Sequence, residues 1–191
     1  MPINDETCTA YTMQELEEEL QREQNKEKVF FSFRNTAALL IVVAAVVSLL
    51  SMYVFPVLRI EGTSMEPTYN ENDVVLVLKS KDLKRGDICA FYYNNTVIVK
   101  RVIAVSGDTV DMDPDGNVCV NGAVLSEPYL NDRDYGHTDI TFPYTVPESR
   151  IFVMGDHRSV SIDSRNTAIG CVAQGQIIGK VLFRIWPGGS K

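Results

Sequence analysis

The stretch "IEGTSMEPTYNENDVVLV" (residues 60–77) joins two different kinds of sequence. It follows a long apolar run, and it ends in β-branched residues that are typical of a strand. Between the two, Ser64 lies in a polar bend, and Pro67 restricts the backbone that follows. A serine in a bend is usually ordinary turn chemistry. Its significance therefore depends on the sequence on either side.

The preceding run, "TAALLIVVAAVVSLLSMYVF" (residues 36–55), is almost wholly apolar and carries no charge. A helix of about 20 residues spans roughly 30 Å, the thickness of the hydrocarbon core of a bilayer. A cleaved signal peptide would have a shorter apolar core and a short basic start, and a buried core helix would have a polar face. The pattern predicts a retained transmembrane helix over residues 35–57.

The basic residues near this run predict its direction, because Lys and Arg favour the cytoplasmic side. Four basic residues precede the run: Arg22, Lys26, Lys28 and Arg34. Only Arg59 follows closely. We therefore expect residues 1–34 to be a charged cytoplasmic tail, with a short helix over residues 13–28, and residues 58–191 to lie outside the cell.

Composition excludes several classes of function. The chain of 191 residues is 45% hydrophobic, enough for one packed domain plus an appendage. A net charge of −7 without a basic stripe argues against a nucleic-acid partner. The four cysteines form no CxxC pair and only two His are present, so we expect no metal and no cofactor. We interpret most of the cysteines as small core residues. If a membrane separates Cys8 from Cys89, Cys119 and Cys171, an odd number of cysteines lies on one side. At least one thiol is then free or paired with another chain.

From residue 58 onward, short β runs alternate with turn signals. The runs are "DVVLVLK" (73–79), "GDICAFYY" (86–93), "NNTVIVKRVIAVSGDTVDM" (94–112), "RIFVMGD" (150–156) and "GQIIGKVLFRIW" (175–186). "DPDGN" (113–117) and "NG" (121–122) predict hairpins, and residues 126–147 are typical of a mobile loop. We predict a mainly β domain, an irregular barrel or coiled sheet, behind one N-terminal transmembrane helix.

The unusual residue in these runs is Lys100, within "TVIVKRVIAV" (96–105). Strand alternation gives Lys100 and its neighbour Arg101 one apolar face each, so it does not decide which cation is buried. Arg does not lose its proton in proteins, whereas desolvation lowers the pKa of Lys from about 10.4 by several units. A neutral Lys100 could accept a proton from a serine. The alternative is an edge-strand lysine that discourages aggregation.

A third polar segment, "MGDHRSVSIDSRN" (residues 154–166), directly follows an apolar strand. It is either an ordinary loop or a source of partners for a buried cation. Its spacing is also compatible with a triad of Ser64, His157 and Asp163.

Four segments in this order resemble the bacterial type I signal peptidases: "GTSMEPT" (62–68), "RGDICAF" (85–91), "KRVIAVSGD" (100–108) and "GDHRSVSIDSR" (155–165). The resemblance extends through the outer domain to about Trp186 and includes the anchor. It implies that Ser64 is the nucleophile, that neutral Lys100 is the general base in place of an edge-strand lysine, and that an acyl-enzyme forms and is hydrolysed.

The resemblance also implies roles for the residues around the dyad. Ser161 corresponds to the residue that orients the lysine amine. Asp156 would pair with Arg101, and Asp163 with Arg165, in structural ion pairs.

Three further positions would affect the shape of the site. Met65 and Pro67 would form its floor and the turn that holds the serine. The sequence departs from the family at Gly62, where some members have a serine that binds the oxyanion, and at His157, where Asn is usual. With Gly62, oxyanion binding would fall to the backbone N–H of the nucleophile and a neighbour.

The implied substrates are secretory preproteins, cut after an extended Ala-x-Ala-like segment near the bilayer. "DICAFYY" and "VLFRIW" would supply pocket walls or a lipid-contacting patch, with Phe183 and Trp186 as candidates, or else ordinary core. Two other functions stay open: a specialised Ser/Lys peptidase for a pilin-like substrate, and a catalytically silent β domain that binds extended peptides. Self-cleaving repressors share such a dyad, but the anchor and the lack of a DNA-binding region argue against them.

Overall fold

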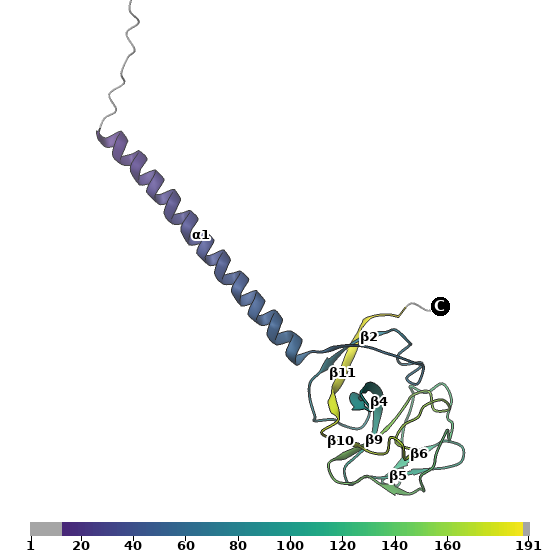
Figure 1. Ribbon diagram of the computed structural model, residues 1–191. Coiled ribbons are helices and arrows are strands. Elements are labelled where there is room, and N and C mark those ends of the chain that lie inside the picture. The colour runs from purple at the N-terminus through teal and green to yellow at the C-terminus, as the bar shows by residue number, and fades with distance from the viewer. Residues whose placement is uncertain (1–12, 189–191) are drawn as a thin grey trace, which may run out of the picture. The chain divides into compact units, whose positions relative to one another are not determined.

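The computed structural model describes residues 13–188, which form two compact units that divide between Ser51 and Met52. The first unit is the helix α1 (Met13–Val54) up to that division (Figure 1). The charged segment 13–28 is thus continuous with the apolar helix rather than a short separate one. Cys8 and the start of the tail lie outside the described residues.

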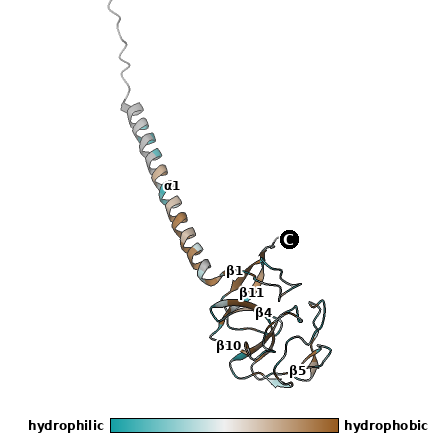
Figure 2. Ribbon diagram, turned by 45° about the vertical axis from the view of Figure 1, so that its right-hand side comes forward, coloured by the Kyte–Doolittle hydropathy of each residue, from teal (hydrophilic) through white to brown (hydrophobic). Residues whose placement is uncertain are grey.

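The apolar part of α1 is Val29–Ser51, which is 23 residues long with a mean hydropathy of 2.1 and is therefore long and apolar enough to cross a membrane (Figure 2). It begins earlier than the expected residue 35, because "VFFSF" (29–33) continues the apolar run across the single charge of Arg34. The helix ends at Val54 because Pro56 lacks an N–H and restricts the residue before it.

The second unit contains two antiparallel sheets. The larger has the order β1-β2-β11-β3-β4-β9-β10 and the smaller β7-β6-β5-β8. The strands of the larger sheet are β1 (Val57–Arg59), β2 (Val74–Leu78), β3 (Ile88–Tyr93), β4 (Thr96–Val105), β9 (Arg150–Met154), β10 (Val172–Ala173) and β11 (Ile177–Trp186). The strands of the smaller are β5 (Thr109–Met112), β6 (Val118–Val120), β7 (Ala123–Val124) and β8 (Tyr144–Thr145).

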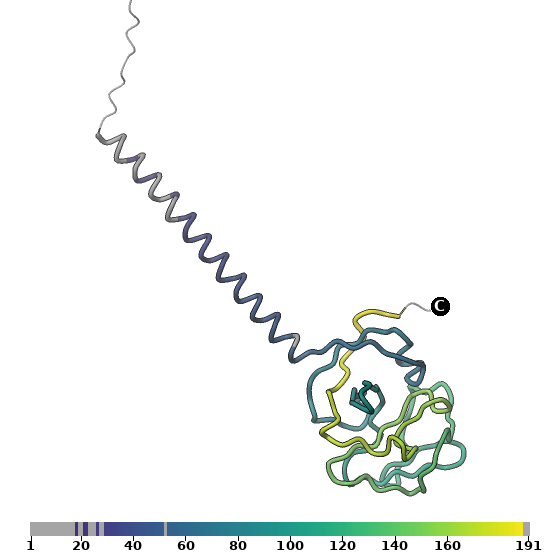
Figure 3. The backbone as a smooth tube through the Cα atoms, in the orientation of Figure 1, coloured from purple at the N-terminus to yellow at the C-terminus, as the bar shows by residue number. Residues whose placement is uncertain are grey.

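The prediction of a mainly β fold is confirmed in its coiled-sheet form. The strands that end the larger sheet, β1 and β10, do not pair with each other in the described part of the chain, so the sheet is not closed. Figure 1 places β4 near the middle of this unit, and Figure 3 shows the chain winding around it. Both expected hairpins are present, as β5–β6 and β6–β7, and residues 126–147 contain only the short strand β8.

Hydrophobic packing fixes the position of the serine turn. Met65 is 1% exposed and belongs to a core cluster with Ile60, Val75 and Val99, so the residue next to Ser64 is anchored beneath the larger sheet. Other clusters lie along both faces of β4 and β9. The result is a rigid central strand beside an anchored turn.

Candidate active site

Ser64 lies in the connection between β1 and β2 and is held by a short hydrogen-bonded turn. The N–H of Glu66 donates to the carbonyl of Thr63 at 3.1 Å, and that of Tyr69 donates to Met65 at 2.9 Å. Tyr69 and Met65 are buried while Ser64 is half-buried. The core residues on this turn therefore leave the serine hydroxyl at the surface of a rigid element.

Lys100 reaches this hydroxyl from β4: its Nζ lies 2.6 Å from Ser64 Oγ. The strand is not at an edge, because β3 and β9 flank it on either side. The edge-strand interpretation of Lys100 is therefore wrong. Both Lys100 and Arg101 are buried, at 3% and 8% exposure, because each face of β4 is covered by core.

Burial lowers the pKa of Lys100 from 10.5 to about 8. The nearby carboxylates of Asp163 and Asp156 act in the opposite direction, and the charge of Arg165 adds to the lowering. A substantial fraction of the amine is therefore neutral near pH 8. In that state it can accept the proton of a hydroxyl within hydrogen-bond distance.

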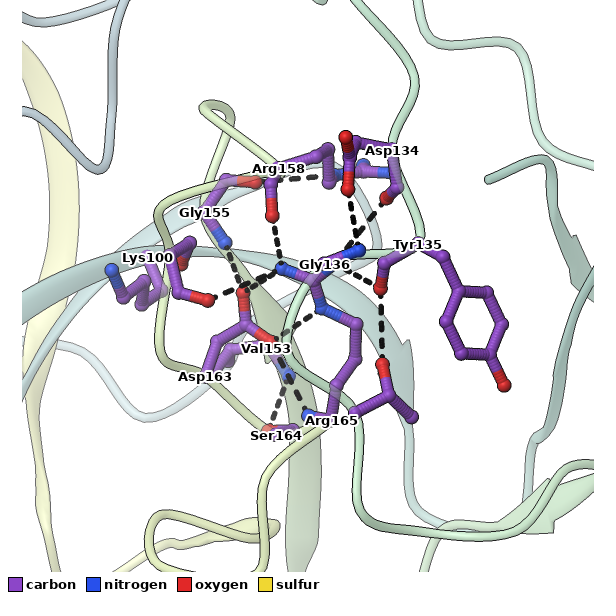
Figure 4. Close-up of polar contacts among 12 residues, drawn as sticks. Lys100, Asp134, Tyr135, Gly136, Val153, Gly155, Arg158, Asp163, Ser164 and Arg165 are labelled. Atoms are coloured by element: carbon purple, nitrogen blue, oxygen red, sulfur yellow. Dashed lines mark hydrogen bonds and ion pairs between the residues drawn. The ribbon is translucent and has the colours of Figure 1, made fainter. Parts of the chain in front are cut away.

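Asp163 forms its ion pair with Arg165 and not with Lys100. Burial alone would raise the pKa of Asp163, but the bidentate guanidinium of Arg165, at 2.9 Å to both carboxylate oxygens, and the N–H of Gly155 hold that pKa below its usual value. In Figure 4 the Arg165 guanidinium also contacts the carbonyls of Tyr135 and Arg158, each at 2.9 Å. Arg165 thus joins the segment after β9, which carries Asp163, to the loop that carries Tyr135.

Arg101 is paired with Asp156, with its Nε and Nη2 at 2.8 and 2.6 Å from the two carboxylate oxygens. Thr68 donates to the same carboxylate at 2.5 Å, and the ring of Tyr129 lies 3.8 Å from the guanidinium carbon. A buried Arg requires such a partner because it stays charged. The ion pair with Asp156 therefore stabilises the buried charge of Arg101 next to Lys100 on β4.

Ser161 is fully buried beside Gly155 and its side chain helps to lower the pKa of Asp163, but no hydrogen bond joins its Oγ to Lys100 among the described residues. Gly155 is required by close approach: a Cβ there would lie 2.3 Å from Ser161 Oγ and 2.5 Å from the Ser64 carbonyl oxygen. Ser161 therefore lies close to the serine turn, where the predicted orienting role would need it, but it does not hydrogen-bond the Lys100 amine.

His157 does not form the alternative triad. Its Nδ1 lies 3.3 Å from the carbonyl oxygen of Thr63, and its ring is 40% exposed. The Asp163 carboxylate is bound by Arg165 and by Gly155, and no contact joins it to His157 among the described residues. Ser64 Oγ instead has Lys100 as its partner.

The other predicted positions surround the turn. Gly62 is exposed and its φ is +77°, and Pro67 is exposed after a cis peptide bond with Glu66. Within residues 13–188 no group of three or more potential ligands forms a metal site. Cys89 and Cys171 are buried and Cys119 half-buried, all three as free thiols.

A small groove opens beside Ser64, between the chain that follows β1 and the start of β4. Its volume is about 60 Å³. The residues that line it are Leu58, Arg59, Ile60, Glu61, Ser64, Met65, Val97, Ile98 and Val99. The exposed lining of the groove is more polar than apolar, and the edge strand β1 of the larger sheet supplies Leu58 and Arg59 to one side of it.

Similarity to known proteins identifies the family of this chain. The model of the signal peptidase family, peptidase S26, matches residues 33–186. The chain belongs to this family. A signal peptidase I of Bacillus amyloliquefaciens is 36% identical over 77% of this chain and 85% of its own length, and one of Bacillus licheniformis is 32% identical over 87% and 94%. A crystal structure of a signal peptidase I from Enterococcus faecalis V583 is 35% identical and covers 53% of this chain and 97% of that chain, with a TM-score of 0.46. The predicted family, and with it the prediction of a peptidase, are confirmed.

Several residues of the site were not found from the sequence. Glu127 forms a fully buried ion pair with Arg158, and Tyr129 donates to Glu127 at 2.8 Å while stacking on Arg101. Glu127 and Tyr129 come from the segment 126–147, which the sequence predicts only as a loop. No local pattern marks them, because their partners are distant in the sequence.

Proposed function

We propose that this chain is a membrane-anchored endopeptidase that removes signal peptides from secretory preproteins, with Ser64 as nucleophile and Lys100 as general base. The observation that carries the proposal is the 2.6 Å contact between Ser64 Oγ and the buried Lys100 Nζ. The same contact argues against a catalytically silent peptide-binding domain, which would have no use for a costly buried amine.

In the proposed reaction, neutral Lys100 takes the proton of Ser64 as the hydroxyl oxygen attacks the scissile carbonyl carbon. The backbone N–H of Ser64 donates to no described residue, and it is therefore available to bind the oxyanion. Protonated Lys100 then gives its proton to the leaving amine, and an acyl-enzyme remains. A water molecule, deprotonated by Lys100, hydrolyses the ester and frees the hydroxyl of Ser64.

The groove beside Ser64 supports a preference for small side chains before the scissile bond. An extended peptide can pair with the edge strand β1 and direct alternate side chains into the groove. A volume of about 60 Å³ leaves space only for small side chains. We propose Ala-x-Ala-like cleavage segments on this basis.

We further propose that the apolar helix anchors the chain in the cell membrane, with the tail cytoplasmic and the β unit outside. Arg22, Lys26 and Lys28 precede the apolar segment and Arg34 lies near its start, whereas only Arg59 follows it closely. On β11, Phe183 and Trp186 are 55% and 70% exposed, so they are not core residues and are available for contact with lipid. "DICAFYY", by contrast, is largely core, because Cys89, Ala90 and Phe91 are fully buried.

The test is cleavage of a preprotein with an Ala-x-Ala site by the full chain in detergent. Wild type should release the mature protein, while Ser64→Ala and Lys100→Met should not. Cleavage by either variant at the wild-type rate would reject the dyad. Protease treatment of intact cells should remove the β unit, and its protection would reverse the proposed topology.

A further inference from the structure

His157 contacts the serine turn at two points. Its backbone N–H donates to the carbonyl oxygen of Ser64 at 3.1 Å, and its ring Nδ1 lies 3.3 Å from the carbonyl oxygen of Thr63. The same ring nitrogen lies 4.0 Å from the carboxylate of Glu66. One residue of the segment after β9 is therefore bonded to both carbonyls that flank the nucleophile.

The Thr63 carbonyl oxygen and the Glu66 carboxylate determine whether His157 Nδ1 donates or accepts a hydrogen bond. A backbone carbonyl and a carboxylate are both acceptors, so the Nδ1 that faces them carries a hydrogen and acts as a donor. Nδ1 in that state cannot take a proton from Ser64, and no hydrogen bond joins the His157 ring to Ser64 Oγ among the described residues. The imidazole of His157 therefore acts on the nucleophile through the backbone of the turn.

The carbonyl of Thr63 helps to set the conformation of the turn around Ser64. It already accepts the N–H of Glu66 at 3.1 Å, which closes the turn around Ser64. Thr63 and Gly62 are exposed, and a Cβ at Gly62 would meet no atom within 4 Å, so packing does not fix this side of the turn. The ring of His157 supplies a restraint that packing does not.

We propose that His157 is a positioning residue, whose ring N–H holds the Thr63 carbonyl and so keeps Ser64 Oγ in hydrogen-bond contact with Lys100. This inference depends on the proposed function of the Ser64–Lys100 pair. A misplaced nucleophile slows the chemical step, while the rest of the groove, lined by residues 58–61 and 97–99, still binds substrate. Loss of the ring donor therefore lowers kcat and leaves KM unchanged.

The test compares four variants of the full chain in detergent by their kcat and KM for the same preprotein. His157→Ala removes the donor. His157→Asn restores an N–H on the atom attached to Cγ, where Nδ1 stands, whereas His157→Asp places only acceptors there. His137→Ala is the matched control, because His137 is exposed in the loop before β8.

We expect His157→Ala and His157→Asp to lower kcat about five- to tenfold, the effect of losing one positioning hydrogen bond, with KM unchanged. His157→Asn should stay within about twofold of wild type, and His137→Ala should equal it. Equal kcat for wild type and His157→Ala, an effect on KM alone, or equal losses in the Asn and Asp variants would each overturn the inference. Loss of all activity in both the Ala and the Asn variants would overturn it too, and would make His157 the base. The proposed function itself is tested separately: it would be wrong if Ser64→Ala or Lys100→Met still cleaved the preprotein.

Discussion

Replacing Lys100 with Met should stabilise the folded chain while abolishing catalysis. The pKa of Lys100 is about 8 in the fold against 10.5 for the free side chain. At about 1.4 kcal/mol per pH unit, this difference corresponds to roughly 3 kcal/mol of unfavourable burial for the charged amine. Methionine has a similar length and no charge, and the half-buried Ser64 can bond to water after the change.

The size of this stabilisation varies with pH. Below about pH 8 both the folded and the unfolded chain hold the Lys100 proton, so the folded wild type carries the full penalty. Between about 8 and 10.5 only the unfolded chain binds that proton, and wild-type stability rises with pH. The gain from Lys100→Met should therefore be about 3 kcal/mol near pH 6 and shrink toward a small constant value above about pH 10.

The assay is urea unfolding of the full chain in detergent across this pH range, followed by tyrosine and tryptophan fluorescence. Lys81→Met is the matched control, because Lys81 is exposed and loses the same group from the surface. Parallel stability curves for wild type and Lys100→Met at every pH would refute the reasoning. They would mean that folding does not change the affinity of Lys100 for its proton.

Three other predictions concern the same site. The kcat/KM for preprotein cleavage should rise with pH through an apparent pKa of about 8, since only neutral Lys100 accepts the Ser64 proton; a flat profile into the acid range would contradict this. Asp156→Asn should destabilise the chain by roughly 3–5 kcal/mol in urea unfolding, because Arg101 stays charged without its partner; a loss below about 1 kcal/mol would count against the buried pair. Gly155→Ala should lower kcat by about tenfold or more, because its Cβ displaces the Ser64 carbonyl; wild-type kcat would show that the segment shifts freely.

Much of the fold follows from local sequence. The β-branched runs became strands, and the Asn121–Gly122 pair joins β6 to β7 as such a dipeptide should. The apolar helix was recognised, but its start was not, because Arg34 interrupts the run that begins at Val29. Short-range patterns are reliable where one periodicity dominates and fail where a single charge interrupts it.

The site shows where local reasoning ends. Alternation could not rank Lys100 against Arg101, because β4 lies between core clusters and both of its faces are buried. The stacking of Tyr129 on Arg101 and the buried pair of Glu127 with Arg158 depend on how a loop folds back over the sheet. Such contacts are set by tertiary packing and leave no periodic mark in the sequence.

The most direct test of the account is the titration of Lys100 itself. In the full chain in detergent, labelled at the lysine Cε and Nζ atoms and assigned with Lys100→Met, NMR should show the Lys100 amine losing its proton with a pKa of about 8. A Lys100 amine that stays fully charged to about pH 10, like a lysine in water, would contradict the proposal that burial prepares it to activate Ser64.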